Sequence, residues 1–224
     1  MEDRQQAQTL IKKVIENTSQ VIIGKEGAIE LGVIALFSQG HILIEDVPGV
    51  GKTMLAKSIA KSTGCEFKRL QFTPDMLPSD ITGTNVYNQS SSNFEFRPGP
   101  IMSQMVLVDE INRATPKTQS ALLEAMEEHQ VSIDGVSYDL PVPFMILATQ
   151  NPIEYEGTFP LPEAQLDRFL MRVRLGYPSA DQTVEILGSQ QYGHPIDSLE
   201  PVAQPADIVS VAKAARAIHL DDKI

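Results

Sequence analysis

Residues 40–53 of the chain read GHILIEDVPGVGKT. The first half, from His41 to Glu45, is a short apolar run that ends at a turn containing proline and glycine, which is the pattern of a buried strand. The residues from Lys52 to Lys61 have the spacing of a helix. The segment therefore predicts a strand, a glycine-rich turn and a helix in direct succession, the unit from which α/β proteins are built.

The turn between this strand and this helix has the composition of a phosphate-binding loop. Glycines let backbone N–H groups turn inward onto phosphates, a lysine reaches the β and γ oxygens, and a hydroxyl reaches Mg²⁺ at the start of a helix. Gly49, Gly51, Lys52 and Thr53 supply these groups. The pattern expects glycine at position 46, so we expect the side chain of Asp46 to point away from the phosphates. The alternative is a chance Gly-Lys-Thr turn, which the flanking strand and helix argue against.

Two acidic residues follow a second apolar strand, which runs from Met105 to Val108. Ligands of α/β proteins bind at the carboxyl ends of parallel strands. There, Asp109 can hold Mg²⁺ directly or through water, and Glu110 can deprotonate a water for attack on the γ-phosphate. Taken alone, such a pair is more typical of a helix-capping turn. Its position after the phosphate loop favours hydrolysis.

Two further polar residues are candidates for the site. The apolar strand from Phe144 to Ala148 leads to Asn151, which can contact the γ-phosphate or the attacking water; a turn residue before proline is the alternative. Arg168 follows a helix-like segment and can act as a finger on the ATP of a neighbouring subunit. The alternative for Arg168 is an ion pair with an acid of its own chain.

The rest of the pattern predicts an α/β domain with a mostly parallel sheet. Further helices are expected over residues 4–18, 26–37 and 115–129, and further strands over 66–72 and 170–175. Asp134-Gly135 predicts a tight hairpin, and residues 86–100 predict a second hairpin or a loop. Beyond Pro178, residues 181–224 hold two expected helices and no third, which is what a fragment ending inside a second, helical domain would show.

Composition excludes several classes of protein. The 224 residues include 18 Lys and Arg and 29 Asp and Glu, a net charge of −11, which argues against a surface for DNA or RNA phosphates. The longest apolar run, Leu31 to Phe37, is too short to cross a bilayer. The N-terminus has no signal-sequence pattern. Cys65 is the single cysteine and cannot form an internal disulfide, so we expect a reducing, cytoplasmic location.

Taken in order, these motifs resemble those of the AAA+ ATPases and, among them, the MoxR family. The segments that carry the resemblance are residues 40–53, 109–114 with 117–128, 148–154, and 161–169. It covers roughly residues 23–175. The resemblance implies a P-loop NTPase fold, with a three-layer αβα core over residues 1–178 and the beginning of a C-terminal helical lid over residues 179–224.

The resemblance also implies roles for single residues. The residues expected at the nucleotide are Asp46, Val47, Pro48, Gly49, Val50, Gly51, Lys52, Thr53 and Met54, with Ile22 and Ile23 at the adenine. Thr53 and Asp109 are expected at Mg²⁺, Glu110 as the base that activates water, Asn151 as sensor 1 and Arg168 as a finger acting across a subunit boundary. Residues 131–138 and 86–100 correspond to two insertions of the family. A second sensor arginine is not matched, because Arg216 lies outside the motif.

The implied function is a Mg²⁺-dependent ATPase that forms a ring, expected to be a hexamer, and remodels partner proteins. Partners with von Willebrand factor A domains are expected from the resemblance. One alternative is a nucleic-acid motor, although residues 131–138 contain no Lys or Arg for such a partner. Another is a nucleotide-gated binding module, which would not need Glu110, Asn151 and Arg168.

Overall fold

The computed structural model describes residues 2–153, 157–191 and 193–218. Its centre is a five-stranded sheet in the order β2-β5-β8-β1-β9, and every neighbouring pair is parallel. The strands are β1 (Ile42–Glu45), β2 (Phe67–Gln71), β5 (Met105–Asp109), β8 (Met145–Gln150) and β9 (Met171–Val173). The predicted α/β fold with a mostly parallel sheet is confirmed.

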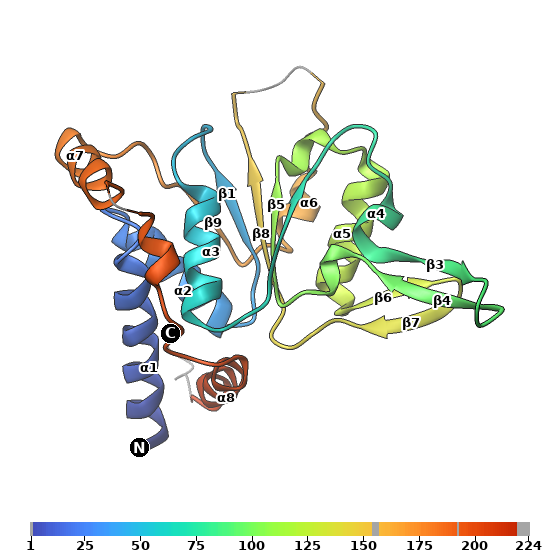
Figure 1. Ribbon diagram of the computed structural model, residues 1–224, viewed down its shortest axis with the longest axis horizontal. Coiled ribbons are helices and arrows are strands. Elements are labelled where there is room, and N and C mark those ends of the chain that lie inside the picture. The colour runs from blue at the N-terminus through green and yellow to red at the C-terminus, as the bar shows by residue number, and fades with distance from the viewer. Residues whose placement is uncertain (1, 154–156, 192, 219–224) are drawn as a thin grey trace.

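The sheet lies between two helical layers (Figure 1). One face is covered by α1 (Glu2–Ser19), α2 (Glu26–Phe37), α3 (Lys52–Ser62) and α8 (Pro205–Arg216); the other by α4 (Pro78–Thr82), α5 (Pro116–Glu128) and α6 (Glu163–Leu166). Successive side chains of a strand point to opposite faces. Ile42 and Ile44 therefore enter the first core and Leu43 the second. Burial on both faces explains why these strands are apolar throughout.

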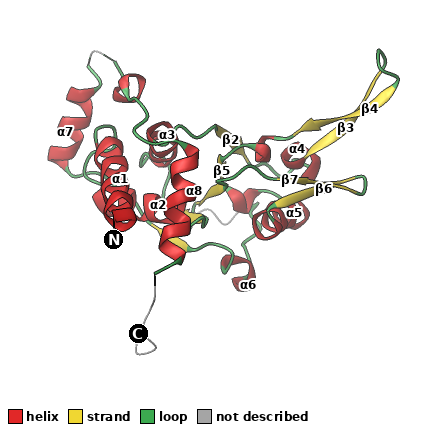
Figure 2. Cartoon of the chain, turned by 90° about the horizontal axis from the view of Figure 1, so that it is seen from below, coloured by secondary structure: helices red, strands yellow, loops and turns green. Residues whose placement is uncertain are grey.

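Two hairpins extend beyond α5 (Figure 2). One is formed by β3 (Gly83–Asn88) and β4 (Asn93–Pro98), the other by β6 (Gln130–Ile133) and β7 (Val136–Asp139). The Phe96 and Tyr138 rings stack with their centroids 4.0 Å apart, and Asn85 donates a 2.7 Å hydrogen bond to Asp134. We call residues 83–98 and 130–139 the hairpin arm. The Asp134-Gly135 turn has the expected positive φ at both residues, and the stretch 86–100 proves to be a hairpin that begins at Gly83.

The C-terminal part is helical, as expected. It contains α7 (Ala180–Ser189), which has no buried residue, a 3₁₀ turn over Pro195–Ser198, and α8. The side chains of Ile208, Val211 and Ala212 on α8 are buried and pack in the first core, beside α1 and α2. The division at residue 178 stays a prediction. No helix in the described ranges is both long and apolar enough to cross a membrane.

Candidate active site

A polar cavity of about 370 Å³ opens at the carboxyl ends of the central strands. Its lining comes from the loop after β1, the ends of β2, β5 and β8, and the start of α3. The lining residues are Pro48, Gly49, Gly51, Lys52, Thr53, Met54, Arg69, Gln71, Asp109, Glu110, Thr149 and Asn151. The structure therefore brings the predicted phosphate loop, both acids and Asn151 to one place.

The phosphate loop depends on two glycines. Gly49 and Gly51 have φ values of +86° and +93°, which side-chain-bearing residues rarely adopt. A Cβ at either position would meet no atom within 4 Å, so the requirement for glycine is conformational. Gly51 is the N-cap of α3, and the N-terminus of α3 therefore faces the cavity with Lys52 and Thr53 in its first turn.

The side chain of Asp46 turns away from this cavity, as predicted. It is buried, and its Oδ2 accepts the backbone N–H groups of Leu175 at 2.7 Å and Gly176 at 2.6 Å, while Oδ1 accepts that of Val47 at 2.9 Å. Burial raises the pKa of the Asp46 carboxyl, but these amides and the charge of Lys52 outweigh it, and the pKa lies below its usual value. The strand expected over residues 170–175 is shorter and ends at Val173; near its expected end, the amide of Leu175 binds Asp46 instead of a neighbouring strand.

Lys52 is held at the cavity by the backbone of the same loop. Its Nζ donates a 2.7 Å hydrogen bond to the carbonyl oxygen of Asp46. Desolvation lowers the pKa of Lys52, and the carboxylates of Asp46, Asp109 and Glu110 offset part of this shift. The ammonium group is thus placed among acids inside a loop built for phosphates.

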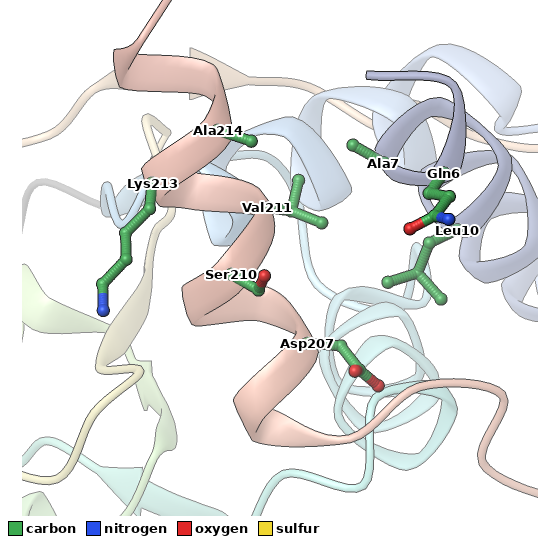
Figure 3. A pocket seen from close by; sticks show the side chains of 8 residues that line it. All are labelled: Gln6, Ala7, Leu10, Asp207, Ser210, Val211, Lys213 and Ala214. Carbon is green, nitrogen blue, oxygen red and sulfur yellow. The ribbon is translucent and has the colours of Figure 1, made fainter. Parts of the chain in front are cut away.

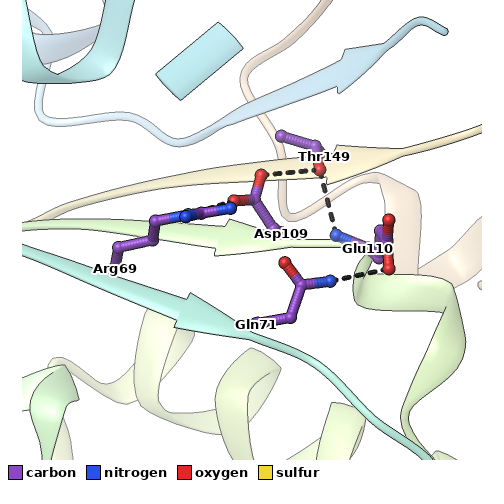
Figure 4. Close-up of polar contacts among 5 residues, drawn as sticks. All are labelled: Arg69, Gln71, Asp109, Glu110 and Thr149. Carbon is purple, nitrogen blue, oxygen red and sulfur yellow. Dashed lines mark hydrogen bonds and ion pairs between the residues drawn. The ribbon is translucent and has the colours of Figure 1, made fainter. Parts of the chain in front are cut away.

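Asp109 ends β5, and both of its carboxylate oxygens have partners (Figure 4). Its Oδ2 lies 2.6 Å from Nε of Arg69, and its Oδ1 accepts a 3.2 Å hydrogen bond from the hydroxyl of Thr149. The carboxylate is nearly buried. With the Thr53 hydroxyl on the same cavity, it forms a set of hard oxygen donors, which fits Mg²⁺ bound together with phosphates.

Glu110 has a left-handed backbone, with φ of 56°, which is uncommon outside glycine and is concentrated at functional sites. Its N–H donates to the Thr149 hydroxyl at 3.0 Å. Its Oε2 accepts hydrogen bonds from Gln71 at 2.6 Å and from Arg113 at 3.2 Å. The side chain expected to act as the base is therefore held by two donors beside the cavity.

Asn151 lines the cavity, directly after β8. Its Oδ1 also accepts the backbone N–H of Ile153 at 3.2 Å. Asn151 therefore also makes the turn contact that the alternative interpretation expects. Glu154, within the quoted motif, lies outside the described residues.

A second, more apolar cavity of about 210 Å³ adjoins the first, sharing Gly49, Gly51 and Met54 with it. Its lining includes the predicted Ile22 and Ile23, and also Val50. Other lining residues are contributed by the N-terminal loop and the region around α7: Val21, Lys25, Pro178, Ile186, Gln190 and His194. A flat nucleobase such as adenine, attached to phosphates bound in the adjoining loop, would fit this cavity.

Arg168 does not line either cavity. Its Nε and Nη2 lie 2.8 Å and 2.6 Å from Oε2 of Glu127 on α5. The intramolecular ion pair, named above as the alternative for Arg168, is therefore present in the structure. The proposed action on a neighbouring subunit stays a prediction.

Another cavity, of about 490 Å³, lies between α1 and α8 (Figure 3). Its side chains include Ala7, Leu10 and Val211 with one acid, Asp207, and one base, Lys213. Asp207 accepts the backbone N–H of Gln204 as a helix cap. With its acid engaged in capping, this cavity has no group of convergent polar side chains comparable to that around Lys52.

Sequence reasoning missed Arg69, Gln71 and Thr149 as parts of the site. Arg69 and Gln71 lie on β2, and they meet the acids because β2 pairs with β5 in a register that sets Gln71 opposite Asp109. The one available signal was their place at the end of a predicted strand. Thr149 lies within residues 148–154, two positions before Asn151, and its contact with Asp109 depends on strands β5 and β8 lying side by side.

Comparisons with known proteins agree with this geometry. Residues 41–171 match the family described as "ATPase family associated with various cellular activities (AAA)". The chain is 54% identical to YeaC of Bacillus subtilis (strain 168) over 215 residues, and this match covers 96% of the chain and 67% of YeaC. It is 47% identical over 177 residues to chaperone MoxR1 of Mycobacterium tuberculosis, covering 79% of the chain and 47% of MoxR1.

A crystal structure from Cytophaga hutchinsonii, described as that of a "putative ATPase", superimposes with a TM-score of 0.88 at 39% identity. The match covers 99% of this chain and 67% of that one. The chain thus spans about two thirds of YeaC and of the Cytophaga protein and about half of MoxR1. With a matching family profile over more than half of its length and relatives at 54% and 47% identity, the chain belongs to the MoxR family of AAA+ ATPases.

Proposed function

We propose that this chain hydrolyses ATP in the polar cavity with the help of Mg²⁺. The observation that carries the proposal is the convergence of Lys52, Thr53, Asp109 and Glu110 on one cavity, from the loop after β1 and the end of β5. A loop of inward N–H groups at a helix N-terminus binds phosphates. Two acids at the end of β5, Asp109 and Glu110, supply the groups that hydrolysis needs.

Each residue has a part in this chemistry. Lys52 meets the β- and γ-phosphates, and Thr53 with Asp109 would hold Mg²⁺, which neutralises charge on those phosphates when bound. Glu110 takes the proton of the attacking water, and Gln71 and Arg113 hold its carboxylate in place until then. Asn151 orients the water or the γ-phosphate from the end of β8.

We further propose that the protein works as a ring, with a hexamer as the expected form, in the cytoplasm. Arg168 would then reach the ATP of a neighbouring subunit. Its partners are proteins to be remodelled, in keeping with the chaperone name of MoxR1, and the family resemblance suggests proteins with von Willebrand factor A domains.

The test is the variant Glu110→Gln. It should bind ATP as tightly as the parent, because the phosphate loop is unchanged, while turnover falls by about 10²- to 10⁴-fold, the usual effect of losing a general base. ATP binding and phosphate release are measured on the same preparation. The control Glu128→Gln removes an exposed carboxylate on α5 and should leave both values unchanged. A Glu110→Gln variant that hydrolyses like the parent would refute the assignment of the base.

A further inference from the structure

Strand β2 contributes one more positively charged side chain, that of Arg69, to the lining of the polar cavity. Its neighbour β5 is parallel, and Arg69 pairs in register with Leu107, two residues before Asp109. The Arg69 side chain extends along the strand to reach that carboxylate, as Figure 4 shows, with Nε 2.6 Å from Oδ2. Arg69 is about half exposed whereas the carboxylate is 10% exposed, so the ion pair lies at the mouth of the cavity.

This contact uses an oxygen that a metal ion would need. The other oxygen of Asp109 is engaged by the hydroxyl of Thr149, itself buried. A divalent ion can bind Asp109 only by displacing the guanidinium or by approaching it closely. Displacement breaks the attraction between Arg69 and the carboxylate, and close approach brings two positive charges together. Lys52 adds a second positive charge to the same cavity. Phosphates would reverse this balance, because they bring negative charge to both cations.

We propose that Arg69 is a positioning residue that holds Asp109 against free divalent ions, so that the metal enters with the nucleotide and not before it. The inference rests on the proposed function in one respect, the role of Asp109 at the metal. Without nucleotide, Arg69 is the counter-ion of Asp109. When phosphates bind the guanidinium of Arg69, the metal ion replaces Arg69 as that counter-ion.

The experiment measures binding of Mn²⁺ to the full chain without nucleotide, by electron paramagnetic resonance of the free ion. Arg69→Gln should bind Mn²⁺ about tenfold or more tightly than the parent, because a positive charge next to the carboxylate is gone. Arg69→Lys keeps the charge and should stay close to the parent. Lys68→Gln is the matched control: Lys68 precedes Arg69 on β2, is equally exposed, and pairs with Glu66, so its removal should not change Mn²⁺ binding.

The double variant Arg69→Gln with Asp109→Asn should lose the added affinity, which locates the ion at Asp109. Unchanged or weaker Mn²⁺ binding by a folded Arg69→Gln chain, or tight binding that survives in the double variant, would overturn the inference. Folding of each variant is checked by its thermal unfolding. A parent that binds no ATP would instead refute the proposed function, and that outcome is read separately from Mn²⁺ binding.

Discussion

His41 lies buried at the start of β1, and its ring joins the sheet to α5. Nδ1 accepts the backbone N–H of Ile146 at 3.1 Å, which leaves the proton on Nε2, 3.3 Å from the carbonyl oxygen of Met126. Burial lowers the pKa of His41 to about 4, with a further decrease from nearby His129, against a smaller opposing effect of the Met126 carbonyl. The ring is therefore neutral in the folded protein at pH values where an exposed histidine is protonated.

The pKa of His41 predicts how stability depends on pH. Between the ordinary pKa of 6.5 and the folded value of about 4, the unfolded chain binds more protons, so stability falls as the pH is lowered through this range. The loss attributable to His41 should be on the order of 3 kcal/mol. Urea unfolding of the parent and of His41→Phe should show a gap at pH 7 that shrinks toward pH 4.

The control for this prediction is His194→Gln, at the N-cap of the 3₁₀ turn over Pro195–Ser198. Its free energy of unfolding is measured over the same pH range, as the reference for removing a histidine that lies outside the contact between β1, β8 and α5. A gap between parent and His41→Phe that stays constant from pH 7 to pH 4 would contradict the prediction.

At the residue scale, what the sequence could predict was set by local chemistry. Lys52 and Glu110 follow directly from the types and order of their neighbours. Arg69 could not be assigned, because its partner Asp109 is 40 residues away and their contact depends on strand order and register. Asp46 was expected to turn aside, but its partners, 129 and 130 residues further on, were beyond any sequence pattern.

At the scale of elements, the hairpin arm joins two segments with separate origins. One hairpin interrupts the path from β2 to β5, and the other follows α5, yet Phe96 stacks on Tyr138 between them. Neither hairpin is long enough to be stable alone. Their contact therefore contributes to the order of both.

A double-mutant cycle measures that contact. Phe96→Ala, Tyr138→Ala and the double variant should give a coupling of about 0.5–1.5 kcal/mol in the free energy of unfolding, the usual value for an aromatic pair. Tyr138→Phe keeps the ring and should keep most of the coupling. Additive single effects would show that the two rings do not stabilise each other. ATP binding should be unaffected in every variant, because neither ring lines the cavities at the phosphate loop.

Elements with strong periodicity were predicted to within a few residues. The buried strands β1, β5 and β8 are continuous apolar runs, and α5 has a clear apolar face with residues such as Leu122 and Met126 buried. The stretch 86–100 stayed undecided, because its serines and asparagines at 88–93 have no apolar alternation and the β3–β4 hairpin is exposed along most of its length.

At the scale of the whole molecule, Arg168 is bound to Glu127 on the surface of its own chain, away from both cavities. An ion pair of this exposure contributes little to stability. Arg168 can therefore exchange Glu127 for a phosphate at a small cost in free energy, as a finger acting on a neighbouring subunit must do.

Mixing two inactive variants tests this arrangement. Arg168→Ala lacks the finger and Glu110→Gln lacks the base, so each should be inactive alone. In a one-to-one mixture, roughly a quarter of randomly formed interfaces would combine an intact base with an intact finger, and ATPase activity should reappear. Specific activity of the parent should also rise with protein concentration. A mixture that stays inactive while the parent shows activity independent of concentration would place Arg168 outside the reaction.

The carboxylate of Asp46 also has a mechanical consequence. It pins the amide of Gly176, and Tyr177, Pro178 and Ser179 alone separate that fixed point from the start of α7. Pro178 restricts its own φ, and Lys25 binds the carbonyl of Tyr177 at 3.0 Å. Gly176, with φ of +66° and open space around its α-carbon, is the natural pivot. Any rotation of α7 relative to the sheet would therefore begin next to a residue that Asp46 ties to the loop after β1.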